Sequence, residues 1–164
     1  MRLLHRIGLA ALAGAMLAAP VASQKPDDQI HSRSLELMRQ GETLLGAGKF
    51  SEADDALETA LAVDPRNRAA FVVMARVAQK QKLFGQAIRF TNKALALEPR
   101  DRDALVVQGE AMVELGAVPR AKANLEKLQK LCPSGCKQLT SLSAAISRGP
   151  SVASVKPPAS PKTN

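Results

Sequence analysis

The same pattern of residues returns in this chain every 34 positions. Phe50 and Phe84 are one period apart, and the stretches that begin with them, 50–65 and 84–99, match in the placement of alanine, leucine and proline. A weaker third copy covers 118–133. Three copies without an insertion indicate a repeat architecture, in which each unit is one supersecondary motif that buries its apolar face against its neighbours.

Each copy is typical of two α-helices joined by a short turn. Apolar residues recur at helical spacing, and glycine follows the first helix. Proline ends the second helix, because it disfavours helical geometry in the residue before it. In the first unit, Ser51 with Asp54 three residues later predicts a capping box at the start of the second helix. We therefore predict an all-α solenoid of helix-turn-helix units at 34–67, 68–101 and 102–135.

The two ends of the chain differ in composition from the repeats. Arg2 and Arg6 precede a short apolar run and then small residues, which is typical of a secretory signal peptide, predicted here over 1–23. A polar linker over 24–33 is expected to follow it. Leu139, Leu142 and Ile146 have helical spacing and predict a helix over 136–148 that caps the last repeat. Residues 149–164 are rich in Pro, Ser and Lys, and we expect a disordered tail.

The repeats resemble the tetratricopeptide repeat family. Residues 34–135 carry the resemblance, as three tandem units. The small and proline positions that match the family pattern are Gly41, Gly109, Ala53, Ala87, Ala121, Ala60, Ala94, Pro65, Pro99 and Pro133. Ala75 stands where the pattern has glycine, and Leu128 where it has alanine. The resemblance implies that small residues lie where paired helices touch, and that the first helices line a concave groove that binds a peptide or helix of a partner.

The phase of the repeats assigns residues to that groove. An apolar row of Met38, Val72 and Val106 is expected beside a charged row of Glu42, Arg76 and Glu110. Each of these side chains could instead pack between repeats. The Lys/Asn pattern by which some chaperone-binding members hold a C-terminal carboxylate is absent, so chaperone-tail binding is not predicted. The full set of predicted groove residues is Leu35, Met38, Glu42, Leu45, Ala69, Val72, Arg76, Gln79, Asp103, Val106, Glu110 and Val113.

Cys132 and Cys136 are the two cysteines of the chain and flank a Pro-Ser-Gly turn. In an exported protein, thiols in this position favour a disulfide that holds the capping helix on the last repeat. A redox-active dithiol is the alternative, although the pair lacks the two-residue spacing of that class. Two cysteines are too few ligands for a metal site, and we expect neither a metal nor a cofactor.

Composition and charge limit the classes of partner and function that we expect for this chain. The net charge is +8, but the second repeat has seven basic and two acidic residues while the first has three basic and seven acidic. Nucleic acid is not an expected partner, because no Trp or Tyr and only four Phe are present to stack on bases. No stretch after the signal peptide is long and apolar enough for stable membrane insertion.

We predict a non-catalytic protein-interaction module, exported to a bacterial periplasm, which binds another protein. A thiol-redox or enzyme-accessory protein that uses Cys132 and Cys136 is one alternative, and a self-associating structural protein is another. No set of residues typical of an enzyme active site was found. The oligomeric state is left open.

Overall fold

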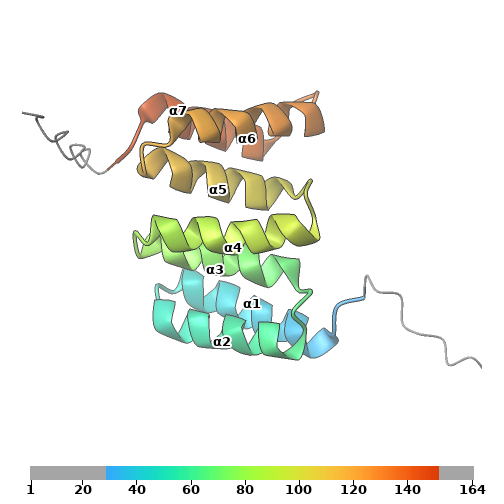
Figure 1. Cartoon of the computed structure of the whole chain (residues 1–164). Helices are drawn as coiled ribbons and strands as arrows, with labels where there is room; N and C mark the ends of the chain where they lie inside the picture. The colour runs from blue at the N-terminus through green and yellow to red at the C-terminus, as the bar shows by residue number, and fades with distance from the viewer. Residues whose placement is uncertain (1–28, 152–164) are drawn as a thin grey trace, which may run out of the picture.

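The structure is a computed structural model that describes residues 29–151. The predicted signal peptide, half of the predicted linker (24–28) and most of the predicted tail lie outside these residues. Within them the chain forms seven α-helices and no strand (Figure 1). The helices are α1 (Ser32–Gly46), α2 (Phe50–Val63), α3 (Arg68–Lys80), α4 (Phe84–Leu97), α5 (Arg102–Glu114), α6 (Val118–Leu131) and α7 (Lys137–Arg148).

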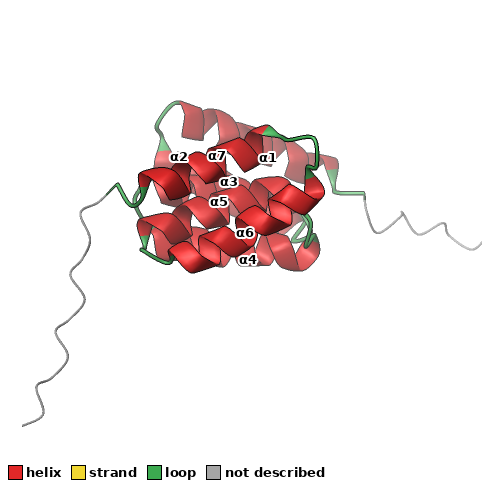
Figure 2. Ribbon diagram, turned by 90° about the horizontal axis from the view of Figure 1, so that it is seen from above, coloured by secondary structure: helices red, strands yellow, loops and turns green. Residues whose placement is uncertain are grey.

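The helices pair into hairpins that stack in sequence order. α1 packs with α2, α3 with α4 and α5 with α6, and α7 covers both helices of the last hairpin. Figure 1 shows this stack from the side, and Figure 2 shows from above that the helices of successive hairpins lie over one another. The predicted all-α fold, three helix-turn-helix repeats and a C-terminal capping helix, is confirmed.

Two residues one repeat apart start the first helices of the second and third hairpins. The side chain of Asn67 accepts a hydrogen bond from the backbone N–H of Ala70 (3.2 Å), and that of Asp101 accepts from Ala104 (2.8 Å). Each satisfies a backbone donor that the first turn of a helix leaves free. Both side chains are buried at the junction between hairpins, so the caps also fix where one repeat meets the next.

The predicted capping box is wrong. α2 begins at Phe50 rather than after Ser51, and Lys49 precedes it without a side-chain cap. The carboxylate of Asp54 accepts instead from Nε2 of Gln81 in the next repeat (3.3 Å). Partial burial raises the pKa of Asp54 above its ordinary value.

The turns inside the hairpins have the same backbone geometry in all three repeats. Gly48, Lys82 and Gly116, spaced one period apart, have φ of +75°, +61° and +73°. This left-handed geometry closes the first helix of each hairpin with a hydrogen bond between residues five apart, for example from Ala117 N to Met112 O (2.8 Å). Glycine adopts this geometry without steric cost, whereas Lys82 does not.

Small residues occupy the contact between paired helices. Ala53, Ala87 and Ala121 are one period apart and fully buried. A Cβ on Gly41 would lie 2.6 Å from Cγ of Leu57, and a Cβ on Gly109 would lie 2.6 Å from Cδ1 of Leu142. Both distances are shorter than packing allows, so the helices could not approach as closely with larger residues at these positions.

The link from α6 to α7 is a short disulfide-closed loop. Cys132 and Cys136 are joined by a disulfide, with their Cα atoms 5.8 Å apart. Cys132 is the last residue before the loop and Cys136 the residue before α7. The bridge therefore fixes the start of the capping helix to the end of the last repeat helix.

Candidate binding groove

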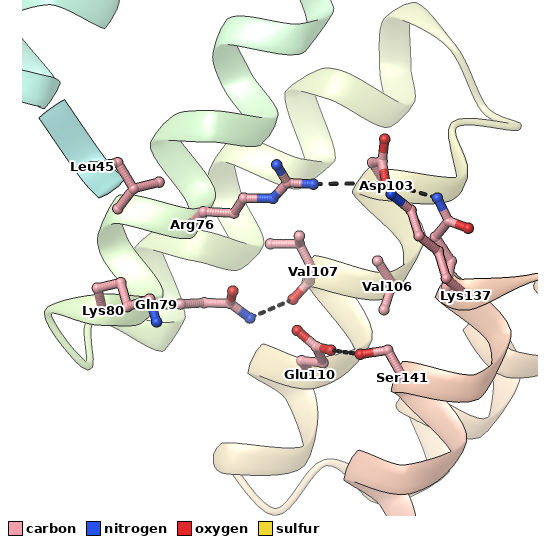
Figure 3. A pocket seen from close by; sticks show the side chains of 11 residues that line it. Leu45, Arg76, Gln79, Lys80, Asp103, Val106, Val107, Glu110, Lys137 and Ser141 are labelled. Carbon is pink, nitrogen blue, oxygen red and sulfur yellow. Dashed lines mark hydrogen bonds and ion pairs between the residues drawn. The ribbon is translucent and has the colours of Figure 1, made fainter. Parts of the chain in front are cut away.

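A pocket of about 420 Å³ opens on the face formed by the first helices of the hairpins and the capping helix (Figure 3). No residue of α2, α4 or α6 lines it. The contributions come from one residue of α1, three of α3, four of α5 and three of α7. The lining residues are Leu45, Arg76, Gln79, Lys80, Asp103, Val106, Val107, Glu110, Lys137, Gln138 and Ser141.

The floor of the pocket is apolar and firmly held. Val106 and Val107 of α5 are 7% and 3% exposed. Gln79 of α3 donates from Nε2 to the carbonyl oxygen of Val107 (3.0 Å), a bond between two neighbouring first helices that Figure 3 shows. This bond holds α3 against α5 and fixes the width of the pocket at this level.

Both acidic side chains in the wall of the pocket, those of Asp103 and Glu110, have polar partners. Oδ1 of Asp103 lies 3.6 Å from Nη2 of Arg76 and accepts a hydrogen bond from Nε2 of Gln138 (3.0 Å). Oε1 of Glu110 accepts from the hydroxyl of Ser141 (2.6 Å). Two of these contacts come from α7, so the capping helix forms part of the wall of the pocket as well as the end of the stack.

Two lysines at the pocket differ from these groups. Lys80 at the end of α3 and Lys137 at the start of α7 are both exposed. Neither has an ion-pair or hydrogen-bond partner among residues 29–151. In Figure 3 they lie at opposite sides of the pocket. Their positive charges are therefore available to a bound molecule.

A second pocket of about 370 Å³ adjoins the first, with which it shares Gln79, Lys80 and Glu110. Glu114, at the end of α5, accepts hydrogen bonds there from the N–H (2.8 Å) and hydroxyl (2.7 Å) of Ser151. We call the two pockets together the trough. The residues that only the second pocket contributes are Lys82, Phe84, Glu114, Ala145, Arg148 and Ser151.

Residues 44–105 match a family model described as Tetratricopeptide repeat. The first tetratricopeptide domain of Spaghetti (RPAP3), solved with the HSP90 peptide SRMEEVD, is 26% identical to this chain with a TM-score of 0.62. That alignment covers 70% of this chain and 94% of the other. Residues 44–105 thus match the tetratricopeptide repeat, and the described helices share the tetratricopeptide fold.

Two further structures share this tetratricopeptide fold. The second domain of human RPAP3, in complex with the HSP70 peptide SGPTIEEVD, is 22% identical with a TM-score of 0.64, over 71% of this chain and 98% of that one. The translocator chaperone SycD of Yersinia enterocolitica type III secretion is 15% identical with a TM-score of 0.62, over 72% and 89%. No curated protein matches the chain in sequence. Tetratricopeptide domains of known structure thus include peptide-binding ones.

Several residues predicted for the tetratricopeptide groove line the pocket. They are Leu45, Arg76, Gln79, Asp103, Val106 and Glu110. Glu42 lies beside it, with Oε1 3.8 Å from Nη1 of Arg76. Leu35 and Ala69 line a different pocket, of about 400 Å³, at the junction of the first two repeats. Met38 is partly buried and packs against the core of the first hairpins.

Two of the predicted groove residues need correction. Val72 is 4% exposed and Val113 is 1% exposed, and neither lines the pocket. Val113 packs with Met112 and Ala121 inside the last hairpin, and Val72 belongs to the main core. Val72 therefore packs between repeats, which was the alternative that the sequence left open, and Val113 packs within the last hairpin.

The sequence reasoning missed Lys80, Val107 and the three pocket residues of α7, Lys137, Gln138 and Ser141. A signal for the last three was present. Lys137 is one period after Asp103 and Ser141 one period after Val107, so α7 has the phase of a first helix of a fourth unit. Treating it only as a cap removed its residues from the predicted groove.

The described residues offer little else that resembles a chemical site. In 29–151 no group of three or more His, Cys, Asp or Glu side chains is arranged to hold a metal ion. Cys132 is 5% exposed and its Sγ lies 3.8 Å from Nη1 of Arg102. None of the helices from α1 to α7 has the length and hydropathy needed to cross a membrane.

Proposed function

We propose that this protein is a non-catalytic interaction module that holds a segment of a partner protein in the trough. The observation that carries the proposal is the pocket itself. It has an apolar floor, polar walls and contributions from four alternate helices, α1, α3, α5 and α7, on one face of the stack. Grooves of this kind accept an extended or helical segment by burying its apolar side chains. The peptide complexes of related domains support the same reading.

We also propose that the protein works outside the cytoplasm, in a bacterial periplasm, after loss of residues 1–23. The basic start, apolar run and small residues of that segment support export. The disulfide between Cys132 and Cys136 is consistent with an oxidising compartment. Fractionation of cells that express the full chain tests this proposal: protein that stays in the cytoplasm at full length would contradict it.

A matched pair of variants in α7 tests the role of the trough. Ser141→Trp places an indole in the pocket, whereas Ser143→Trp places the same side chain on an exposed position that lines neither pocket of the trough. Immobilised wild-type protein and both variants are used to capture partners from cell extract. We expect specific partners to be lost with Ser141→Trp and kept with Ser143→Trp. If both variants capture the same proteins as wild type, the trough is not the binding surface.

A further inference from the structure

We infer that the segment held in the trough is acidic, and that its carboxylates lie against Lys80, Lys137 and Arg148. This inference rests on the proposed function, and it adds the chemistry of the partner. The sequence assigned a charged row of Glu42, Arg76 and Glu110 to the groove. In the structure, basic residues outnumber acidic ones in the lining of the trough.

The excess of positive charge is one of number, and the acidic side chains of the trough already have hydrogen-bond or ion-pair partners. Among the trough residues five are basic and three are acidic. Asp103 is bound to Arg76 and Gln138, Glu110 to Ser141, and Glu114 to Ser151. In the part of the chain that the structure describes, the other four basic residues have no ion-pair partner. They are Lys80, Lys82, Lys137 and Arg148.

The positive groups therefore set the potential of the trough. A concave surface with a low-dielectric floor concentrates the field of unpaired charges along its walls. A basic segment would bring its cations close to unpaired lysines. A neutral segment would bury the floor but leave these cations without partners. An acidic segment meets both requirements, burial of the floor and pairing of the cations. Its apolar side chains cover Val106 and Val107, and its carboxylates pair with the lysines.

The three cations are placed along the trough rather than at one point. Lys80 ends α3, Lys137 begins α7 and Arg148 ends α7. Lys137 and Arg148 thus lie at opposite ends of one helix, and Lys80 lines both pockets. This arrangement suits several acidic side chains distributed along a segment, and it does not require a free C-terminal carboxylate.

Binding is measured with two labelled peptides of about a dozen residues, both amidated at the C-terminus. In one, Glu alternates with Val and Ala; in the other, Gln replaces each Glu. Fluorescence anisotropy of the full chain should give tighter binding of the Glu peptide, with a preference that falls as salt is added. Lys80→Glu/Lys137→Glu should weaken binding of the Glu peptide by about tenfold, since two exposed ion pairs are lost. Binding of the Gln peptide should change little.

The matched control is Lys127→Glu/Lys130→Glu. It makes the same change in net charge on exposed positions of α6 that line neither pocket, and it should leave both affinities unchanged. The inference is overturned if this control weakens the Glu peptide as much, or if the Gln peptide binds equally well. In that last case, loss of the Gln peptide with Ser141→Trp would still support the trough as a binding surface.

A second copy of the chain is the competing occupant, because α2 has four acidic residues and no basic one. Light scattering of the wild-type chain and of Lys80→Glu/Lys137→Glu decides this point. A wild-type dimer that this variant converts to a monomer would assign the trough to self-association and overturn the inference. A monomer in both cases supports a separate acidic partner.

Discussion

Leu142 of the capping helix fills the space that Gly109 leaves open on α5. Its side chain is fully buried, and a Cβ at position 109 would lie 2.6 Å from its Cδ1. At Gly41, the equivalent residue of the first repeat, the corresponding space is filled by Leu57 of the same hairpin. The glycine of the last repeat therefore allows close packing of the capping helix.

We expect Gly109→Ala to destabilise the protein by about 1 kcal/mol. An extra methyl group in a tightly packed contact costs roughly 1–3 kcal/mol, from which the better helix propensity of alanine, about 1 kcal/mol, is subtracted. Chemical denaturation measures the free energy of unfolding. Shortening Leu142 to alanine should remove the close contact with the new methyl group. The double variant Gly109→Ala/Leu142→Ala should therefore be more stable than the sum of the two single changes predicts.

Gly85→Ala is the control for helix propensity. No atom outside its immediate neighbours lies within 4 Å of a Cβ built at this position. Alanine there should leave stability unchanged or raise it by up to about 1 kcal/mol. Equal effects at 85 and 109 would mean that Leu142 does not restrict position 109.

Removing the disulfide should lower stability without ending partner binding. The disulfide closes a five-residue loop. On the chain-entropy model, the entropy that this loop removes from the unfolded chain stabilises the folded protein by about 2 kcal/mol. Cys132→Ala/Cys136→Ala should therefore unfold at a lower temperature than the oxidised protein. Peptide binding, measured below the unfolding transition, should persist. Unchanged stability with complete loss of function would instead favour a thiol-redox role.

The repeat period was enough to predict the fold, because each phased residue has one physical role. Alanine at 53, 87 and 121 permits close helix pairing, and all three are fully buried. Proline at 65, 99 and 133 follows the end of each second helix. These roles are local, so they can be inferred from spacing alone. The placement of the helices in the structure agrees with them.

The candidate site was harder to predict, because it depends on the direction of each side chain. Val72 and Val106 share a phase, yet only Val106 lines the pocket. Both side chains belong to the main core, with Val72 4% and Val106 7% exposed, and only Val106 also reaches the pocket. Whether a cation is paired is also a property of the assembled structure. Lys80 and Arg76 look alike in sequence, but among residues 29–151 only Arg76 has acidic side chains within ion-pair distance.

Lys82→Gly should stabilise the protein by about 0.5–1 kcal/mol. A non-glycine residue in left-handed geometry costs roughly 1–2 kcal/mol, and the greater freedom of glycine in the unfolded chain offsets part of that gain. The φ of Lys82 is +61°, and glycine stands at the same phase in the other two repeats. Thermal or chemical denaturation measures the change. Lys127→Gly, at an exposed position inside α6, should destabilise by about 1 kcal/mol, and a similar loss at 82 would contradict the prediction.

Asp64 should contribute stability that is lost in acid. Hydrogen bonds from the side chain of Arg66, together with one from the backbone N–H of His31 (2.9 Å), lower the pKa of its carboxyl from 3.8 to about 2. Because the folded-state pKa is depressed, this contribution is complete above about pH 4 and disappears as pH falls towards 2. Asp64→Asn should be less stable than wild type at neutral pH, and the difference should shrink across that window. Asp55→Asn, on the exposed face of α2, serves as the control, since no hydrogen bond holds its carboxylate in the structure. Thermal unfolding of the three proteins from pH 6 to pH 2 measures the effect, and a constant difference between Asp64→Asn and wild type over that range would show that the contacts of Asp64 do not depend on its charge.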